Sequence, residues 1–269
     1  TVSLRKLIVA PETQTMREIM EADPVFAHRT DDQEGVARNF RRYDLMSIPV
    51  VDAEERLVGI ITVDDIVDVI QEENTEDFEK MAAMTPSDEE YLRSSVWTLA
   101  KHRVPWLLLL MISATFTGAI IARFESVLSS MVVLTSFIPM LMDTGGNSGS
   151  QTSVMVIRNL ALGEVETRDV WRVLWKELRV AVICGAILAA VNFVRMLLFV
   201  RVDVLVSLTV SLSILCTVII AKGVGCLLPM GAKKLGLDPA IMASPMITTI
   251  VDACALGIYF LLAIQLLGL

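Results

Sequence analysis

Hydrophobic and polar positions divide the chain into two parts with different periodicities. Up to about residue 103, short apolar runs alternate with stretches rich in charge, a pattern typical of a small α/β domain. From residue 104 onward, uncharged apolar runs follow one another, and the first of them, 104–122, is 19 residues long. A helix of about 20 apolar residues crosses the hydrocarbon core of a bilayer. We therefore expect a water-exposed α/β domain followed by a membrane domain.

The first part predicts a small unit of strands and helices. Residues 31–43 carry an amphipathic pattern that favours a helix, and 47–52 and 57–61 are short apolar runs that favour strands. Another helix is expected to begin at Thr62, which is a good N-cap residue, and to continue towards Met84.

The second part predicts a multi-pass α-helical membrane domain. Five spans are expected, of which the second is long and interrupted: 104–122, 126–157, 180–200, 204–230 and 244–268. Lysine and arginine concentrate before the first span, between the second and third, and between the fourth and fifth. Because basic residues stay on the cytoplasmic side, we expect a cytoplasmic N-terminal domain at the cell membrane and a C-terminus outside.

Charge separates the same two parts. Residues 1–103 carry a net charge of −10, and residues 104–269 carry a net charge of +2. The negative charge of the first part excludes a nucleic-acid partner and favours a cation.

The two histidines, His28 and His102, belong to no nucleophile–base arrangement, so we expect no enzyme activity. The four cysteines lie in apolar stretches without ligand spacing and are expected to be packing thiols. Since the chain opens on Thr1, we also expect a longer protein.

Acidic side chains recur at helical spacing in the segment after Thr62. Steps of three and four residues place one row on a single helix face: Asp65, Asp68, Glu72, Glu76 and Glu79. Glu73 and Asp77 form a second short row beside it. Such rows have two explanations, and both stay open at this point. The first is a helix face exposed to solvent. The second is a surface that binds divalent cations, which would relieve the repulsion between the like charges.

An aspartate interrupts the last expected span. Asp252 is the only ionisable residue in 239–269, and a charge at mid-membrane costs about 2.5–3.5 kcal/mol on insertion scales. Such a residue usually marks an ion pathway, a partner or a proton relay, although a protonated acid can also form an interhelical hydrogen bond. Thr248 and Thr249 share its helix face, and an all-oxygen lining suits Mg²⁺ or Ca²⁺. A two-fold axis would supply a second aspartate.

A glycine-rich polar stretch, Pro139–Gln151, lies inside the second expected span. Its three glycines, together with Asn147 and Gln151, predict one of two arrangements. The first is an irregular backbone that lines a watery path, and the second is close helix packing through small residues. In the first arrangement, backbone carbonyls and the Asn147 amide would face a hydrated ion.

A third candidate site lies where an expected strand opens into a helix. Thr62 there would lie near a phosphate and Asp65 near a ribose, as in a nucleotide site at a helix N-terminus. A simple cap on the helix is the alternative, and the motif is short.

Together these motifs resemble the MgtE family of magnesium channels. Pro139–Gln151 is similar to the family's P-x-x-x-x-T-G-G-N-x-G-x-Q stretch, and Thr248–Asp252, with Tyr259 and Phe260, is similar to its pore-lining last helix. The resemblance divides the chain into the tail of a preceding CBS domain, a CBS domain, a connecting plug helix and a transmembrane pore domain: 1–11, 12–74, 75–100 and 101–269.

The resemblance implies a homodimer in the bilayer with a Mg²⁺ pore on its two-fold axis. Asp252 of both chains would hold an ion that keeps most of its waters, with further pore positions at Gly146, Asn147, Thr248, Thr249 and Ala255. Ala255 departs from the glycine that the family commonly has there. Cytoplasmic Mg²⁺ on CBS and plug-helix acids would hold the channel shut: Asp32, Glu34, Asp44, Asp65, Asp68, Glu73, Glu76 and Asp77. Family members can also bind ATP at a CBS pair, which would involve Thr62 and Asp65 in the full-length protein.

Two other functions fit the same residues. A cation-coupled secondary transporter would use Asp252 as its proton or sodium site, and it would turn over far more slowly than a channel conducts. A membrane-anchored sensor of Mg²⁺ or a nucleotide would bind its ligand without any ion flux. The sequence does not distinguish Mg²⁺ from Ca²⁺, Mn²⁺ or Co²⁺.

Overall fold

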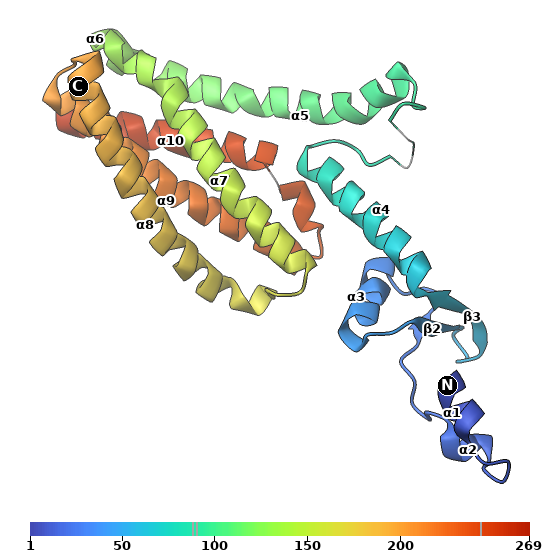
Figure 1. Ribbon diagram of the computed structural model, residues 1–269. Helices are drawn as coiled ribbons and strands as arrows, with labels where there is room; N and C mark the ends of the chain where they lie inside the picture. The colour runs from blue at the N-terminus through green and yellow to red at the C-terminus, as the bar shows by residue number, and fades with distance from the viewer. Residues whose placement is uncertain (88, 90, 243) are drawn as a thin grey trace. The chain divides into compact units, whose positions relative to one another are not determined.

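The chain folds into two compact units, residues 1–75 and 76–269, which are described separately below. The structure is a computed structural model that describes every residue except 88, 90 and 243. Figure 1 shows the first unit in blue and the helices of the second unit from cyan to red.

The first unit is a three-stranded sheet covered by a helix. Its elements are α1 (Leu4–Val9), α2 (Met16–Ile19), β1 (Ala27–His28), α3 (Gln33–Tyr43), β2 (Ser47–Val51), β3 (Leu57–Thr62) and the first part of α4 (Val63–Met81). Strand β1 pairs parallel with β2, and β2 pairs antiparallel with β3. The core consists of Ala27, Val36, Ala37, Phe40, Ile48 and Ile66. The helix and the two strands predicted between residues 31 and 61 are thereby confirmed.

The second unit is a helical bundle centred on α9. Its helices are α5 (Val96–Arg123), α6 (Glu125–Ser130), α7 (Ile138–Ala161), α8 (Val170–Arg195), α9 (Val204–Lys234) and α10 (Ser244–Leu267). Helix α9 packs against α7, α8 and α10, whereas α5 makes its main contact with α10 (Figure 1). Short 3-10 segments precede α7, α8 and α10, and a π-helical turn, Met196–Val200, follows α8.

The fold is mostly helical, as expected. Among the described residues, four helical stretches are long and apolar enough to cross a membrane: Val96–Arg123, Thr167–Val200, Val204–Lys234 and Pro239–Leu267. Helix α7 has 24 residues, but its glycines, Asp143 and Arg158 make it more polar than these four. The membrane-crossing character of α7, and with it the fifth span, stays a prediction.

The glycine-rich stretch is an unbroken part of α7, so the prediction of irregular backbone there is wrong. The break in the second expected span lies earlier, at Met131 and the 3-10 segment Val132–Phe137. Within α7, the missing Cβ atoms admit neighbouring helices. A Cβ on Gly145 would lie 2.7 Å from Thr217 Cγ2, and a Cβ on Gly149 would lie 2.7 Å from Ile247 Cγ2. Close packing through small residues, the alternative interpretation, is correct.

The segment 75–100, expected as a connecting plug helix, is helical only in part. Helix α4 ends at Met81, and Ala83 follows with a left-handed φ of 54°, which a helix does not continue through. Helix α5 begins at Val96, where the Ser95 hydroxyl caps the backbone N–H of Thr98. Residues 88 and 90 of this segment lie outside the described residues.

The backbone contact between α7 and α9 generates a stability prediction. A Cβ on Gly225 would lie 2.3 Å from the carbonyl oxygen of Gly149, a backbone atom that cannot rotate away. We expect Gly225→Ala to lower the free energy of unfolding by about 1–3 kcal/mol through overpacking. Thermal unfolding in detergent measures the change.

Gly223→Ala is the matched control for this prediction, because Gly223 lies on the same helix and a Cβ there would meet nothing within 4 Å. Replacing a helical glycine by alanine in open space is neutral or stabilises by up to about 1 kcal/mol. Equal melting temperatures for the two variants would show that the α7–α9 contact is looser than described.

Candidate functional site

Asp252 lies half-buried on α10, one turn after two threonines. The hydroxyls of Thr248 and Thr249 both donate hydrogen bonds to the backbone carbonyl of Pro245, at 2.9 and 3.1 Å. Their hydrogens are therefore engaged within the helix, which leaves oxygen lone pairs free to accept from a water or to contact a cation. The turn of α10 before Asp252 therefore offers hydroxyl oxygens as well as a carboxylate.

Helix α7 brings a second carboxylate to the same region. Asn147 Nδ2 donates to Asp143 Oδ1 across 3.1 Å, and both side chains are exposed in the single chain. Asp143 is exposed and Asp252 of α10 is half-buried, so an acid from α7 and an acid from α10 are both open to solvent in the single chain. Sequence analysis did not single out Asp143, although it lies within the Pro139–Gln151 stretch. Its spacing of four residues before Asn147, which places both on one helix face, was the available signal.

Two of the predicted pore positions pack against a neighbouring helix. A Cβ on Gly146 would lie 2.9 Å from Thr248 Cγ2, and Ala255 has no exposed surface. A Cβ added to Gly145 would lie 4.0 Å from Ala255 Cβ, which is an ordinary van der Waals distance. Gly146 and Ala255 thus set how closely α7 approaches α10, and their place at a pore stays a prediction. Asn147 is exposed and Asp252 is half-buried in the single chain.

The predicted regulatory acids are mostly engaged with neighbouring protein groups. Asp32 accepts the backbone N–H of Gly35 and caps α3, Glu34 pairs with Arg38 at 3.3 Å, and Glu73 accepts from Gln33 at 2.7 Å. Asp44 is the C-cap residue of α3 and has a left-handed φ of 50°. Glu76 forms an ion pair with Lys80. Asp68 is exposed on α4.

In the part of the chain that the structure describes, no three histidine, cysteine, aspartate or glutamate side chains gather as ligands for one metal ion.

Comparison with known proteins decides the family. Residues 138–262 match the model of the MgtE family, described as a divalent cation transporter, and residues 5–72 match the CBS domain model. The chain is 38% identical over 266 residues to the magnesium transporter MgtE of Thermus thermophilus, covering 99% of this chain and 59% of that protein. It is 36% identical to the one of Bacillus subtilis, covering 96% and 57%. The chain belongs to the MgtE family. It spans a little under three fifths of these curated relatives.

The MgtE match covers helices α7, α8 and α9 and most of α10. It begins at α7 and runs into α10, so it contains Asp143, Asn147, Thr248 and Asp252. The CBS match runs from α1 into α4 and contains Thr62 and Asp65.

Thr62 and Asp65 bind each other in the manner of a helix cap. The Thr62 hydroxyl and backbone N–H both donate to Asp65 Oδ2, at 2.6 and 3.1 Å. These hydrogen bonds stabilise the carboxylate and lower the pKa of Asp65. The cap explains both residues locally, and a nucleotide at this position stays a prediction.

Sequence analysis did not single out a bridge at the end of α4. Lys80 Nζ donates to Asp238 Oδ2 across 2.6 Å and pairs with Glu76. Partial burial disfavours the ammonium charge, but the two carboxylates outweigh burial and raise the pKa of Lys80. Met81 packs beside Ile157 and Ala240. The end of α4 is thus attached to α7 and to the segment that leads into α10.

A buried polar triad joins three helices of the MgtE region. Lys222 of α9 donates to the Thr152 hydroxyl of α7 across 3.1 Å, and that hydroxyl donates to Glu177 of α8 across 2.9 Å. Lys222 Nζ also lies 3.7 Å from Glu177 Oε2, and its side chain is 8% exposed. The Lys222 charge is thus compensated inside the bundle, which explains how an apolar helix tolerates it.

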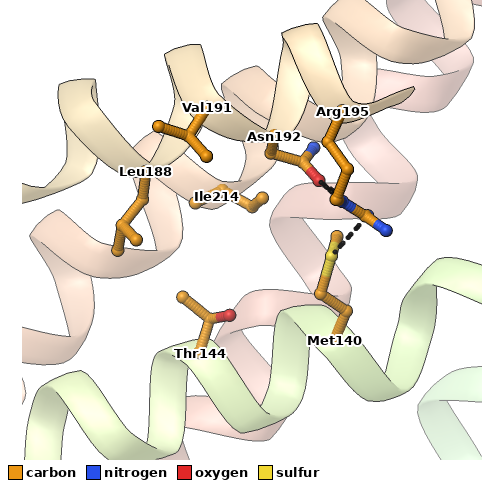
Figure 2. A pocket seen from close by; sticks show the side chains of 7 residues that line it. All are labelled: Met140, Thr144, Leu188, Val191, Asn192, Arg195 and Ile214. Atoms are coloured by element: carbon orange, nitrogen blue, oxygen red, sulfur yellow. Dashed lines mark hydrogen bonds between the residues drawn. The ribbon is translucent and has the colours of Figure 1, made fainter. Parts of the chain in front are cut away.

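A small pocket lies beside these helices and contains none of the predicted site residues. It has a volume of about 150 Å³ and is shown in Figure 2, lined by Met140, Thr144, Leu188, Val191, Asn192, Arg195 and Ile214. Arg195 donates to Asn192 Oδ1 across 2.8 Å and to Met140 Sδ across 3.2 Å. Its lining is largely apolar and offers no acid to a cation.

The triad generates a stability prediction. Lys222→Met leaves Glu177 without its cation, and removing one partner of a buried ion pair costs about 3–5 kcal/mol. We expect a large drop in the thermal midpoint for Lys222→Met, and a smaller one when Glu177→Gln is added, because no unpaired charge then remains.

The exposed pair Arg168–Glu166, with side chains 78% and 57% exposed, provides the control. Arg168→Met should change the free energy of unfolding by no more than about 1 kcal/mol. If Lys222→Met behaved like Arg168→Met, the triad would not be the compensated site described here.

Proposed function

We propose that this protein is a Mg²⁺ channel of the cell membrane whose pore ion is held by Asp252 from two copies. The observation that carries the proposal is the position of Asp252. It is half-buried in an apolar helix able to cross a membrane, on a side that also carries oxygen atoms from Thr248 and Thr249. Relatives of this chain are magnesium transporters by name.

The chemistry of Mg²⁺ supports a hydrated ion at this position. Mg²⁺ demands six oxygen ligands in octahedral geometry and gives up its waters reluctantly. One chain offers the carboxylates of Asp252 and Asp143 and the Asn147 amide, too few for direct ligation. A two-fold axis doubles the carboxylates and places them around a shared path. Water-mediated contacts also keep binding weak enough for the ion to leave, as conduction requires.

Electrostatics supports the homodimer. Asp143 of α7 is exposed and Asp252 of α10 is half-buried, and both carboxylates carry the same charge. Two acids close together repel each other unless a cation lies between or beside them. A divalent ion on the axis between two copies neutralises the charge that each copy exposes.

Cytoplasmic Mg²⁺ is proposed to close the channel through the acids of the CBS region and α4. Glu76 is held by Lys80, and Glu73 accepts from Gln33. A divalent ion competes with these partners because it interacts more strongly with carboxylates. Binding would shift an equilibrium between open and closed states by its differential affinity for the closed one. The other acids proposed to contribute are Asp32, Glu34, Asp44, Asp65, Asp68 and Asp77.

Removal of the pore carboxylate tests the channel directly. We expect Asp252→Ala to reduce Mg²⁺ influx into proteoliposomes to the level of empty vesicles, because the carboxylate that attracts the hydrated ion is lost. Asp203→Asn is the control: Asp203 is exposed at the start of α9 and accepts the backbone N–H of Leu205, a cap that asparagine preserves. Equal influx through Asp252→Ala and the parent protein, with the oligomer intact, would contradict the assignment.

Neutralising acids of α4 tests the regulation. We expect Glu73→Gln/Glu76→Gln/Asp77→Asn to raise the cytoplasmic Mg²⁺ concentration for half-inhibition by about tenfold, within the usual range of allosteric coupling. Single-channel recording of open probability against Mg²⁺ concentration measures the shift.

The control removes the same charge elsewhere. Glu12→Gln/Glu21→Gln/Glu54→Gln changes three exposed glutamates whose side chains make no hydrogen bond or ion pair among the described residues. A shift of the same size in both triple variants would mean that net charge, and not these α4 acids, sets the inhibition.

A further inference from the structure

The first turns of α8 expose an unusual combination of side chains. Trp171 and Trp175 are 76% and 63% exposed. Arg172, Lys176 and Arg179 are exposed beside them. Their spacing of one, three and four residues gathers all five on one side of the helix. We call this set the basic–aromatic face of α8.

The opposite side of the same turns packs into the bundle. Val173 and Leu174 lie against the cluster of Val156, Leu160, Cys226 and Met230. Glu177, the only acid in Val170–Arg195, points inward to Thr152 and Lys222. Acid and bases are therefore separated across the helix, and the acid is already paired.

The cations of the basic–aromatic face have no anionic partner in the described part of the chain. Neither Arg172 nor Lys176 forms an ion pair there. Arg179 donates to the backbone carbonyl of Trp175 across 3.4 Å and lies 6.0 Å from the centre of the Trp175 ring. Of the three acids in the loop before α8, the two nearest the helix are committed, since Glu166 pairs with Arg168 and Asp169 accepts the Glu166 backbone N–H.

The same side of α8 becomes purely apolar further along. Val180, Ile183 and Ile187 are 37%, 62% and 59% exposed. They follow the tryptophans and cations at helical spacing. Within one continuous surface, a cationic and aromatic end thus passes into an apolar stretch. Tryptophan prefers the boundary between headgroups and hydrocarbon, where its ring is amphipathic.

We propose that the basic–aromatic face of α8 binds the headgroup of an anionic phospholipid, whose acyl chains lie along Val180–Ile187. Charge complementarity supports this occupant, because three unpaired cations meet a phosphate-bearing headgroup. The adjoining apolar surface suits acyl chains, which a soluble acidic partner does not provide. Pairing of this face with the same face of a second copy is disfavoured, because the two faces would bring cations together and supply no acid. The inference requires that the protein lies in a membrane and does not depend on the transported ion.

Equilibrium binding of phosphatidylglycerol to the detergent-purified protein, counted by native mass spectrometry, tests the proposal, with phosphatidylcholine as the neutral-headgroup reference. We expect Arg172→Gln/Lys176→Gln to weaken phosphatidylglycerol binding by at least about tenfold, since each basic residue near a membrane surface attracts anionic lipid. Phosphatidylcholine binding should not change. Arg172→Lys/Lys176→Arg keeps both charges and should retain binding.

Lys233→Gln/Lys234→Gln is the matched control, because it removes two cations from the end of α9, where no tryptophan is near in sequence. Loss of binding only in the α8 variant supports the site. Equal loss in both variants, or unchanged phosphatidylglycerol binding in Arg172→Gln/Lys176→Gln, would overturn it. A change of oligomeric state with lipid binding intact would assign the face to a second copy and overturn it as well.

Discussion

The backbone contact between Gly149 and Gly225 is the constraint on which the membrane unit depends. An added Cβ on Gly225 would approach the Gly149 carbonyl to 2.3 Å, so these helices pack backbone to backbone. That closeness brings Thr152 within hydrogen-bonding distance of Lys222 at 3.1 Å. The glycines of α7 also admit α10, because Gly145 and Gly149 lie against Val251 and Ile247. In a bilayer, where lipid is as apolar as leucine, such small-residue contacts supply the packing that holds helices together.

This packing determines which charged side chains of the membrane unit have a partner of opposite charge. Lys222 and Glu177 are compensated inside the bundle, where an isolated charge would be costly. Asp252 and Asp143 receive no protein cation among the described residues and lie towards the open side of α7 and α10. The unit therefore compensates the buried Lys222 charge by itself and leaves Asp143 and Asp252 to be neutralised by something else. A divalent cation shared with a second copy meets that requirement.

Much of this arrangement is predictable from the sequence, because it rests on local patterns. The helix Gln33–Tyr43, the strands β2 and β3 and the apolar runs of four long helices all follow from periodicity. Asp252 stands out because it is alone in its span.

What the sequence leaves open depends on partners distant along the chain. Glycines in α7 predict flexibility or close approach equally well, and only α9 and α10 decide between the two. Lys222 meets Thr152 across 70 residues, and no local pattern encodes that distance. Ala255 shares a helix with Asp252, yet Ala255 is fully buried whereas Asp252 is only half-buried, and sequence spacing does not show this difference. The acids of α4 show regular spacing, but their hydrogen bonds to Gln33 and Lys80 appear only in three dimensions.

The central claim is that Asp252 of two copies holds a hydrated divalent ion on a two-fold axis. Anomalous X-ray diffraction from crystals of the protein soaked in Mn²⁺, which substitutes for Mg²⁺ in oxygen sites, tests it most directly. The account predicts one anomalous peak on the axis, about 4 Å from each Asp252 carboxylate, because a water lies between ion and protein. A dimer without a peak there, or a peak bonded directly to the carboxylates at about 2 Å, would contradict it.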